Sequence, residues 1–413
     1  MRILMVVGAR PNFVKIAPLM EAMRRHPDIQ PILVHTGQHY DFEMSKVFFV
    51  ELGIPEPDIN LEVGPGTAVK QVAEIMLRLE RVMEETQPDL VLVVGDVNST
   101  LAGALAAVKT GRPVAHVEAG LRSFDRTMPE EINRILIDSV SDFLFVTEPS
   151  GVENLTREGR PPERIYLVGN VMIDSLRRHL SHARHSPLPK ELAVQEVDGA
   201  AAMGPYGLVT LHRPATVDDA ARFRAVWGSL QEISQDLPLI FPVHPRTKQA
   251  MSEIGIPDRR HDDSHGMVLI PPLSYLQFLK LESEATLVIT DSGGVQEETT
   301  ALGVPCLTVR ENTERPITIS EGTNTLVGRE GYRLVQEARK ILRGEGKKGR
   351  IPGLWDGFAA VRIVRNLLSQ VEADKALPGN PVNTGAAIAE FRDRSQVCKQ
   401  LSSEDDPTRD CRV

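Results

Sequence analysis

The sequence is poor in cysteine and in aromatic residues, and it lacks any long apolar run. Only 3 of its 413 residues are cysteine, and 5% are aromatic. So few cysteines, with no Cys-x-x-Cys pair, are typical of a protein kept in a reducing cytosol. No window approaches the roughly 18 apolar residues of a membrane span, and the opening MRILMVVGARPNF lacks a signal-peptide cleavage pattern. We therefore expect a cytoplasmic protein without a membrane partner.

Positive charge is also in deficit. The chain has 47 basic and 56 acidic residues, a net charge of -9, and no block of Lys and Arg. This balance argues against a nucleic-acid partner. At 413 residues the chain exceeds the size at which a single core stops growing, so we expect two domains, and 41% hydrophobic residues can fill both.

Several cofactor and catalytic motifs are missing. The string GPGTAV at 64–69 lacks the third glycine of a dinucleotide fingerprint, and GxxxxGK[ST], HExxH and GxSxG do not occur. His182 and His185 have no acidic or cysteine partner at ligand spacing, which favours solvated histidines over a metal pair. We expect no cofactor and no metal.

Short apolar runs alternate with amphipathic stretches along both halves of the chain. This alternation predicts buried parallel strands and covering helices, which is the pattern of a doubly wound α/β fold. The expected strands are 2–7, 31–35, 89–94, 114–117, 143–146 and 165–168, then 206–211, 239–243, 267–270, 287–290 and 306–309. The expected helices are 14–25, 42–52, 69–85, 100–109, 130–139, 150–157, 218–235, 275–281, 295–302 and 331–342.

The two halves are separated by a polar, proline-containing stretch. We expect an N-terminal Rossmann-like domain at 1–180, a linker at 181–205 and a C-terminal domain at 206–355. A last helix at 356–375, packing back on the first domain, and a disordered tail at 376–413 follow. Ligands of such sheets lie beyond the carboxyl ends of the strands, so residues there are the candidates.

In the first half, charged residues follow three strands. Arg10 and Lys15 follow the first strand at a helix start, which suits a phosphate, although two surface cations are an equal alternative. Asp96 and Glu118 end later strands. Asp96 could equally be a helix cap, and Glu118 could pair with Arg122 or Arg134 in a buried ion pair. Glu130 lies in a first helical turn, where an acid also complements the helix dipole.

In the second half, His212 and His244 each end a strand next to an arginine, which suggests an anionic ligand. The stretch VITDSGGVQEE at 288–298 ends a strand and begins a helix. Ser292, Gly293 and Gly294 can present free N–H groups to a phosphate, and Glu298 can accept hydrogen bonds from a ribose diol. An ordinary capped turn is the alternative. Together these patterns predict a nucleoside-diphosphate site.

The combined motifs resemble the non-hydrolysing UDP-N-acetylglucosamine 2-epimerases. The resemblance runs from Met1 to about Leu368 and rests on GARPNFVKIAP, HVEAGLRS, MPEEINR, TLHRP, PVHPR, TDSGGVQEE and ERPITISEGTNTLVG. It implies the GT-B architecture, two Rossmann-like domains with the site in the interdomain cleft. It also implies interconversion of UDP-N-acetylglucosamine and UDP-N-acetylmannosamine.

The resemblance also implies residue roles. Proton transfers fall to Asp96, Glu118 and Glu130, and the diphosphate to His212 and Arg315. It places Arg10, Lys15 and Phe278 in the substrate site, with Ser292, Gly293 and Gly294 on phosphate and Glu298 on ribose. The chain departs from the commoner family pattern at Ala215 and Thr216, and Leu273 stands where some members have a glutamine near the uracil.

The implied reaction explains why acids and cations share the site. The proton on sugar carbon 2 has no adjacent carbonyl, so it becomes acidic only as the anomeric bond to UDP breaks. Elimination then gives UDP and a 2-acetamidoglucal, and re-addition with protonation on the other face inverts carbon 2. Cations stabilise the departing diphosphate, and general acid–base groups move the proton.

Three alternatives remain open from the sequence. Relatives of this family act on 2,3-diacetamido or uronic-acid UDP-sugars, a GT-B glycosyltransferase would share the nucleotide site, and a UDP-sugar sensor would bind without turnover. Because relatives are commonly dimers, we expect a homodimer. Gln38, His39 and His244 resemble part of a second UDP-N-acetylglucosamine site found in some relatives.

Overall fold

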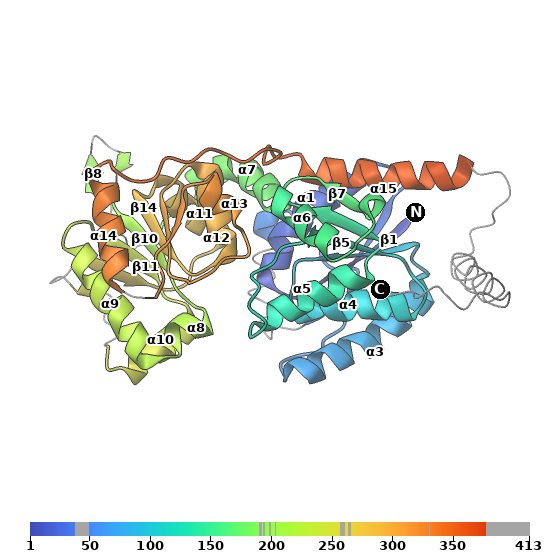
Figure 1. The fold of residues 1–413 in the computed structure, drawn as a ribbon, viewed down its shortest axis with the longest axis horizontal. Coiled ribbons are helices and arrows are strands. Elements are labelled where there is room, and N and C mark those ends of the chain that lie inside the picture. The colour runs from blue at the N-terminus through green and yellow to red at the C-terminus, as the bar shows by residue number, and fades with distance from the viewer. Residues whose placement is uncertain are drawn as a thin grey trace, which may run out of the picture.

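The computed structural model consists of two α/β lobes, each built on a seven-stranded sheet (Figure 1). It describes residues 1–37, 49–189, 192, 195–197, 200–202, 204–256, 261–262, 266–329 and 331–376. Within these residues no helix combines the length and apolar character needed to cross a lipid bilayer. The architecture is the GT-B arrangement of two Rossmann-like domains, as predicted.

The N-terminal sheet has the strand order β3-β2-β1-β4-β5-β6-β7, and all its pairs are parallel. Its strands are β1 Arg2–Val7, β2 Gln30–His35, β3 Ile59–Asn60, β4 Leu90–Val94, β5 Val114–Ala119, β6 Phe143–Val146 and β7 Ile165–Leu167. The helices between them are α1 Arg10–Arg24, α3 Ala68–Thr86, α4 Asn98–Lys109, α5 Pro129–Val140, α6 Pro149–Arg157 and α7 Val171–Arg184. Most of the predicted helix at 42–52 lies outside the described residues.

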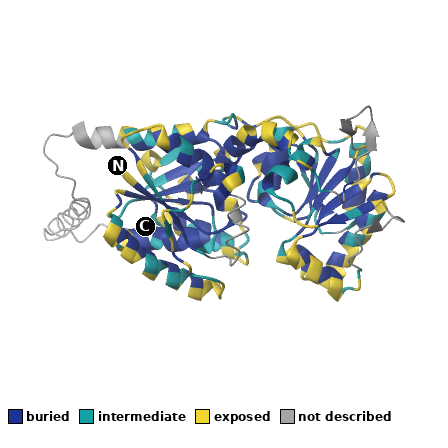
Figure 2. Cartoon of the chain, turned by 180° about the vertical axis from the view of Figure 1, so that it is seen from behind, coloured by how far each residue is buried: buried dark blue, intermediate teal, exposed yellow. Residues whose placement is uncertain are grey.

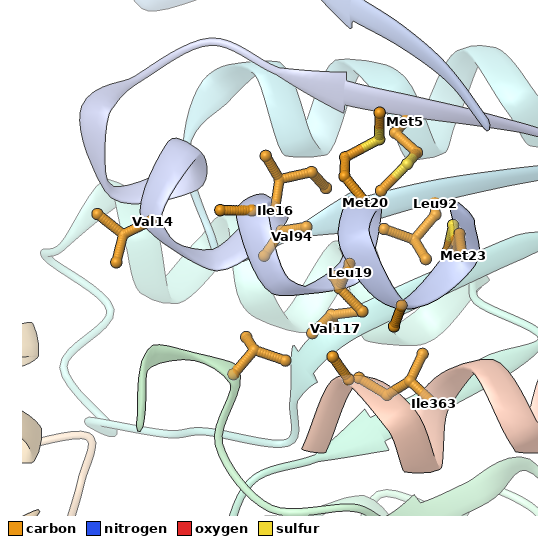
Figure 3. Close-up of a cluster of buried hydrophobic side chains, with 14 of the residues drawn as sticks. Met5, Val14, Ile16, Leu19, Met20, Met23, Leu92, Val94, Val117 and Ile363 are labelled. Carbon is orange, nitrogen blue, oxygen red and sulfur yellow. The ribbon is translucent and has the colours of Figure 1, made fainter. Parts of the chain in front are cut away.

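Both faces of this sheet are buried, which explains its continuous apolar strands (Figure 2). In β1, Met5 packs into the core on the side of α1, whereas Leu4 packs into the core beneath α3 and α4. Figure 3 shows the first of these cores, where side chains of α1 and β1 meet Val117 of β5 and Ile363 of the last helix. The carboxyl ends of the strands are thereby held in fixed register.

The C-terminal sheet has the order β12-β13-β11-β10-β14-β15-β16, and only β12 runs antiparallel. Its strands are β10 Gly207–Thr210, β11 Leu239–Pro242, β12 His261–Asp262, β13 Met267–Ile270, β14 Leu287–Thr290, β15 Cys306–Thr308 and β16 Asn324–Leu326. The helices are α8 Pro214–Val217, α9 Ala220–Ser234, α10 Pro245–Glu253, α11 Tyr275–Glu284, α12 Gly293–Leu302, α13 Ile317–Ser320 and α14 Gly331–Leu342. Five of these elements, β12, β16, α8, α10 and α13, were not predicted, because each is short or lacks an apolar run of its own.

The two lobes are joined by α7 and by the stretch at 343–358, which leads from α14 to the last helix, α15 Ala359–Ala376 (Figure 1). A short hairpin, β8 Gln195–Val197 with β9 Ala200–Ala202, follows α7. α7 packs on α11 and α12 of the C-terminal lobe, while α15 lies against α1 and α7 (Figure 1). Asp174 of α7 accepts hydrogen bonds from the N–H groups of Ala359 and Ala360 at 3.1 and 2.8 Å, which caps α15. The chain therefore crosses the domain boundary twice at one side of the molecule.

Candidate active site

Glu118 lies at an irregular point of the N-terminal sheet. The register of β5 with β6 shifts between Val117 and Ala119, and Glu118 between them has a φ of 80°. A non-glycine residue in this left-handed region costs about 1–2 kcal/mol, and such strain is found preferentially at functional sites. The bulge turns the side chain of Glu118 out of the strand alternation and toward the second domain.

Both carboxylate oxygens of Glu118 contact cations. Oε2 is bound by Lys15 Nζ of α1, and Oε1 accepts a hydrogen bond of 2.8 Å from Arg315 Nη2. Gly95, with φ 71°, leaves room for the first pair, since a Cβ there would lie 3.1 Å from Lys15 Nζ and 3.3 Å from Oε2. The predicted alternative of an ion pair with Arg122 or Arg134 is wrong, because both arginines are bound elsewhere.

Arg315 joins the two domains at this point. Besides Glu118 it contacts Glu314 Oε1 at 2.6 Å and Glu297 Oε1 at 2.8 Å, and it is only 5% exposed. Burial alone lowers its pKa, but the surrounding carboxylates outweigh burial and hold the pKa well above its ordinary value. A permanently charged guanidinium therefore lies at the meeting point of β5, α12 and the 310–316 segment.

Asp96 follows β4 and forms an ion pair with Arg134 of α5. Burial raises its pKa, but the neighbouring cations, Arg134 foremost, outweigh burial and leave the pKa lowered. The predicted alternative, that Asp96 caps a helix, is wrong, because the cap residue of α4 is Val97. Arg134 also binds Glu131, which in turn accepts hydrogen bonds of 2.9 Å from the N–H groups of Ser123 and Phe124. Glu131 therefore holds the loop before α5.

A buried network of hydrogen bonds and ion pairs supports the strand ends that carry Asp96 and Glu118. The sequence did not reveal this network. His116 Nδ1 lies 2.7 Å from Asp138, and its Nε2 lies 2.9 Å from the carbonyl oxygen of Gly95. Arg122 contacts Asp138 at 2.7 Å and Glu158 at 2.7 Å. These contacts fix the ends of β4 and β5, on which Asp96 and Glu118 lie.

For the remaining N-terminal candidates, Glu130, Arg10, Gln38 and His39, the structure gives no ion pair among the described residues. Glu130 is half-buried in the first turn of α5 and has no ion-pair partner among the described residues. Arg10 begins α1, but its side chain lies outside the described part of the chain. Gln38 and His39 also lie outside the described ranges.

His212 is held beside the N-terminus of α12 by Asp291. The Asp291 carboxylate accepts hydrogen bonds from the N–H groups of His212 at 3.0 Å and Arg213 at 2.9 Å, and it lies 3.4 Å from His212 Nδ1. The His212 ring is 36% exposed, and its centroid lies 5.4 Å from that of His244. Asp291 was not predicted, although it directly precedes Ser292 and the glycine pair.

Helix α12 begins at the predicted glycines. Ser292 is its N-cap, so Gly293 and Gly294 lie in the first turn, where N–H groups have no carbonyl partner within the helix. The expectation of a free N–H is wrong for Ser292, which donates to Thr290 Oγ1 at 2.9 Å. The amides of the two glycines and the dipole of α12 together favour an anion.

Glu298 lies one turn further along α12 and is 4% exposed. Its Oε1 accepts a hydrogen bond of 3.1 Å from Tyr275 Oη, and burial raises its pKa to about 7. Phe278, on the same helix as Tyr275, is half-buried and packs in a core with Leu273. The predicted ribose and base residues therefore lie on two adjoining helices.

Glu297 and Glu314 are further site residues that the sequence did not reveal as such. Glu297 accepts a hydrogen bond of 2.9 Å from Asn170 Nδ2, across the domain boundary. Glu314 binds Arg310 at 2.8 Å, and although burial raises its pKa, the arginines around it hold the pKa well below its ordinary value. Both residues adjoin predicted ones, but chain position alone could not show that they meet Arg315.

Comparisons with known proteins agree with this geometry. The family model described as UDP-N-acetylglucosamine 2-epimerase matches residues 21–368. A UDP-N-acetylglucosamine 2-epimerase of Methanocaldococcus jannaschii is 40% identical, with 89% of this chain and 99% of the relative covered. A UDP-2,3-diacetamido-2,3-dideoxy-D-glucuronate 2-epimerase of Pseudomonas aeruginosa is 42% identical, over 83% of this chain and 92% of the relative.

A solved structure is similar as well. The crystal structure of the Methanocaldococcus jannaschii UDP-GlcNAc 2-epimerase, in complex with UDP-GlcNAc and UDP, superimposes with a TM-score of 0.80 at 40% identity. It covers 89% of this chain and all of that chain, 100%. The similarity therefore includes both domains and the boundary between them.

Proposed function

The chain belongs to the UDP-N-acetylglucosamine 2-epimerase family, and we propose that it epimerises carbon 2 of UDP-N-acetylglucosamine reversibly to UDP-N-acetylmannosamine. The protein is an isomerase of nucleotide sugars. The diphosphate of the substrate lies at the N-terminus of α12, and the sugar points toward β4, β5 and α5.

One contact carries this proposal. Arg315, expected to bind the diphosphate, donates a hydrogen bond of 2.8 Å to Glu118, expected to move a proton. A 2-epimerase that eliminates UDP needs these two functions at adjacent atoms of its substrate, because the proton leaves carbon 2 as the bond at carbon 1 breaks. The distance between the two side chains is short enough for one sugar ring to adjoin both.

We assign the chemical roles as follows. Asp96, Glu118 and Glu130 are the acid–base residues, from β4, β5 and α5. His212, Arg315 and the amides of Gly293 and Gly294 stabilise the diphosphate that forms on elimination. Lys15 holds Glu118 in place, Arg10 and Ser292 line the phosphate site, Glu298 accepts hydrogen bonds from the ribose, and Phe278 faces the base. No step needs a hydride carrier.

Incubation with UDP-N-acetylglucosamine in deuterium oxide tests the proposal. Removal and return of the proton at carbon 2 should place deuterium there, and UDP-N-acetylmannosamine should accumulate to an equilibrium mixture. Mass spectrometry and proton NMR measure both results. Recovery of unlabelled, unchanged substrate would reject the epimerase function, and transfer of the sugar to an added acceptor would indicate a glycosyltransferase instead.

A second substrate is favoured by one comparison. The Pseudomonas aeruginosa relative named for a 2,3-diacetamido-glucuronate sugar is 42% identical, about as similar as the Methanocaldococcus jannaschii relative. A panel of UDP-sugars that differ at carbons 3 and 6 separates the two, since kcat/KM should be highest for UDP-N-acetylglucosamine. A higher value for the diacetamido uronic acid would assign the chain to that reaction.

We also propose that the protein acts as a homodimer in the cytoplasm. The outer side of α3 supports a subunit contact, because Val69 is 82% and Leu77 60% exposed there. The sparse cysteine content supports a reducing compartment. Analytical ultracentrifugation of the wild-type protein and of Leu77→Asp tests the first point, since the variant should sediment as a monomer.

A further inference from the structure

The proposed proton carrier is covered by cations in this structure. Lys15 binds one oxygen of Glu118, and Arg315 binds the other at 2.8 Å. Both carboxylate oxygens of Glu118 are therefore already occupied, and neither faces a free space in which a sugar could present its proton. Glu118 must therefore lose one partner before it can take the proton of carbon 2.

Arg315 is the partner that can leave Glu118 without moving far. Glu297 and Glu314 bind its Nε and Nη1 at 2.8 and 2.6 Å, and all three residues belong to the C-terminal lobe. Glu118 is its contact on the N-terminal lobe. The guanidinium also borders the glycine pair, since a Cβ on Gly293 would lie 2.7 Å from Arg315 Nη1. An anion on the amides of α12 would lie against Arg315.

We propose that Arg315 exchanges Glu118 for the diphosphate when the nucleotide binds, so that nucleotide binding itself releases Glu118 for proton transfer. This inference rests on the proposed function. A diphosphate brings two negative charges to the guanidinium and Glu118 only one, and the helix N-terminus holds the diphosphate in addition. Glu118 and the nucleotide therefore compete for Arg315, and the base becomes available only when a substrate is present.

Competition predicts that removing the charge of Glu118 strengthens nucleotide binding. In isothermal titration calorimetry, Glu118→Gln should bind UDP about ten-fold more tightly than wild type, the effect of losing one charge-assisted hydrogen bond. Asp96→Asn is the matched control. It removes a carboxylate of the same site whose ion pair is with Arg134, so it should gain much less than Glu118→Gln. In an Arg315→Gln background, Glu118→Gln should gain no more than Asp96→Asn does.

Two outcomes overturn the inference. The first is that Glu118→Gln binds UDP no more tightly than Asp96→Asn, and the second is that its gain in affinity persists without Arg315. Failure of the wild-type protein to bind UDP would instead reject the proposed function, so the two failures are distinguishable. A crystal structure of the wild-type protein with UDP gives an independent test that needs no variant. Arg315 should contact the diphosphate and lie beyond hydrogen-bond distance of Glu118, and a retained 2.8 Å contact would contradict the exchange.

Discussion

The acid–base region and helix α12 both contain buried carboxylates, yet their pKa values move in opposite directions. In the acid–base region, burial raises the pKa of Asp96 and Glu131, but other groups outweigh burial and leave both lowered. These groups are Arg134 foremost for Asp96, and the N–H of Ser123 followed by Arg134 for Glu131. In α12, burial raises the pKa of Glu297 and Glu298 to about 7. Glu298 has a tyrosine hydroxyl as its partner instead of a cation.

The comparison shows that the balance between burial and all the groups around a carboxyl decides its pKa. Desolvation is the largest influence on all four groups, and it always favours the neutral acid. The neighbouring cations, Arg134 foremost, outweigh it at Asp96, and the N–H of Ser123 together with Arg134 outweighs it at Glu131. At Glu297 it is not outweighed, because Glu118 opposes the effect of Arg315. Asp96 and Glu131 thus stay ionised, whereas α12 combines an anion-binding N-terminus with carboxyl groups whose pKa is raised to about 7.

Replacing the carboxylate at the bulge should have the largest effect. Glu118→Gln keeps the shape of the side chain and loses its ability to carry a proton, so we expect kcat to fall by ~10²- to 10⁴-fold. Turnover is measured by formation of UDP-N-acetylmannosamine. Glu84→Gln, an exposed substitution in α3, is the control and should leave kcat unchanged. Loss of UDP binding by Glu118→Gln would instead make Glu118 a structural residue.

Removing Arg134, the cation paired with Asp96 and Glu131, should destabilise the acid–base region. Arg134→Met leaves the buried Glu131 without its ion pair, and uncompensated buried charges cost about 3–5 kcal/mol. We expect a clear fall in the thermal unfolding midpoint. Arg339→Met is the matched control, because its partners Glu232 and Asp236 are exposed and screened by solvent. Equal falls in both variants would show that burial of the Arg134 pairs carries no special weight.

The sequence predicted the layers of the fold better than the contacts of the site. A continuous apolar run can be recognised from neighbouring residues alone, so the strand at 2–7 was predicted with the bounds that β1 has. β16 is a short Asn-Thr-Leu without an apolar run and was missed. Site residues at strand ends could also be predicted, since ligands collect there in parallel sheets.

The partners of those residues could not be predicted in the same way. Arg315 and Glu118 are 197 positions apart, and their contact depends on how two domains meet. The sequence instead suggested Arg122 and Arg134 for Glu118 because they are near in the chain. Asp138 beneath His116 and Asn170 across from Glu297 were missed for the same reason, as only the folded arrangement brings them together.

The pH dependence of stability should distinguish the raised pKa of Glu298 from the lowered pKa of Asp96. A group whose folded pKa is raised from 4.5 to about 7, as for Glu298, stabilises the fold at low pH and loses that contribution as pH rises. Each such group lowers the free energy of unfolding by up to about 1.4 kcal/mol per pH unit between pH ~5 and ~7. The lowered pKa of Asp96 acts in the opposite sense. Its contribution to the free energy of unfolding is present above the ordinary pKa of an aspartate and is lost as the pH falls through the lowered pKa.

Unfolding midpoints measured from pH 5 to 8 test this difference. Glu298→Gln cannot ionise, so its midpoint should change less over this range than that of wild type. Glu84→Gln should keep the wild-type dependence, because it removes an exposed carboxyl. An unchanged slope for Glu298→Gln would show that Glu298 titrates at the same pH in the folded and unfolded chains.

The smallest effect is expected from the two glycines at the start of α12, which differ only in what faces them. A Cβ on Gly293 would lie 2.7 Å from both Arg315 Nη1 and Glu314 Oε1, whereas a Cβ on Gly294 would meet only Met172 Cε, at 3.4 Å. Gly293→Ala should push Arg315 from its place and weaken UDP binding several-fold, equivalent to about 1 kcal/mol. Gly294→Ala should bind UDP within about two-fold of wild type and gain up to about 1 kcal/mol of stability, because alanine is the better helix former. Calorimetry with UDP and thermal unfolding measure both variants. Equal losses of affinity in the two variants would mean that UDP affinity depends on the amides of α12 and not on the position of Arg315.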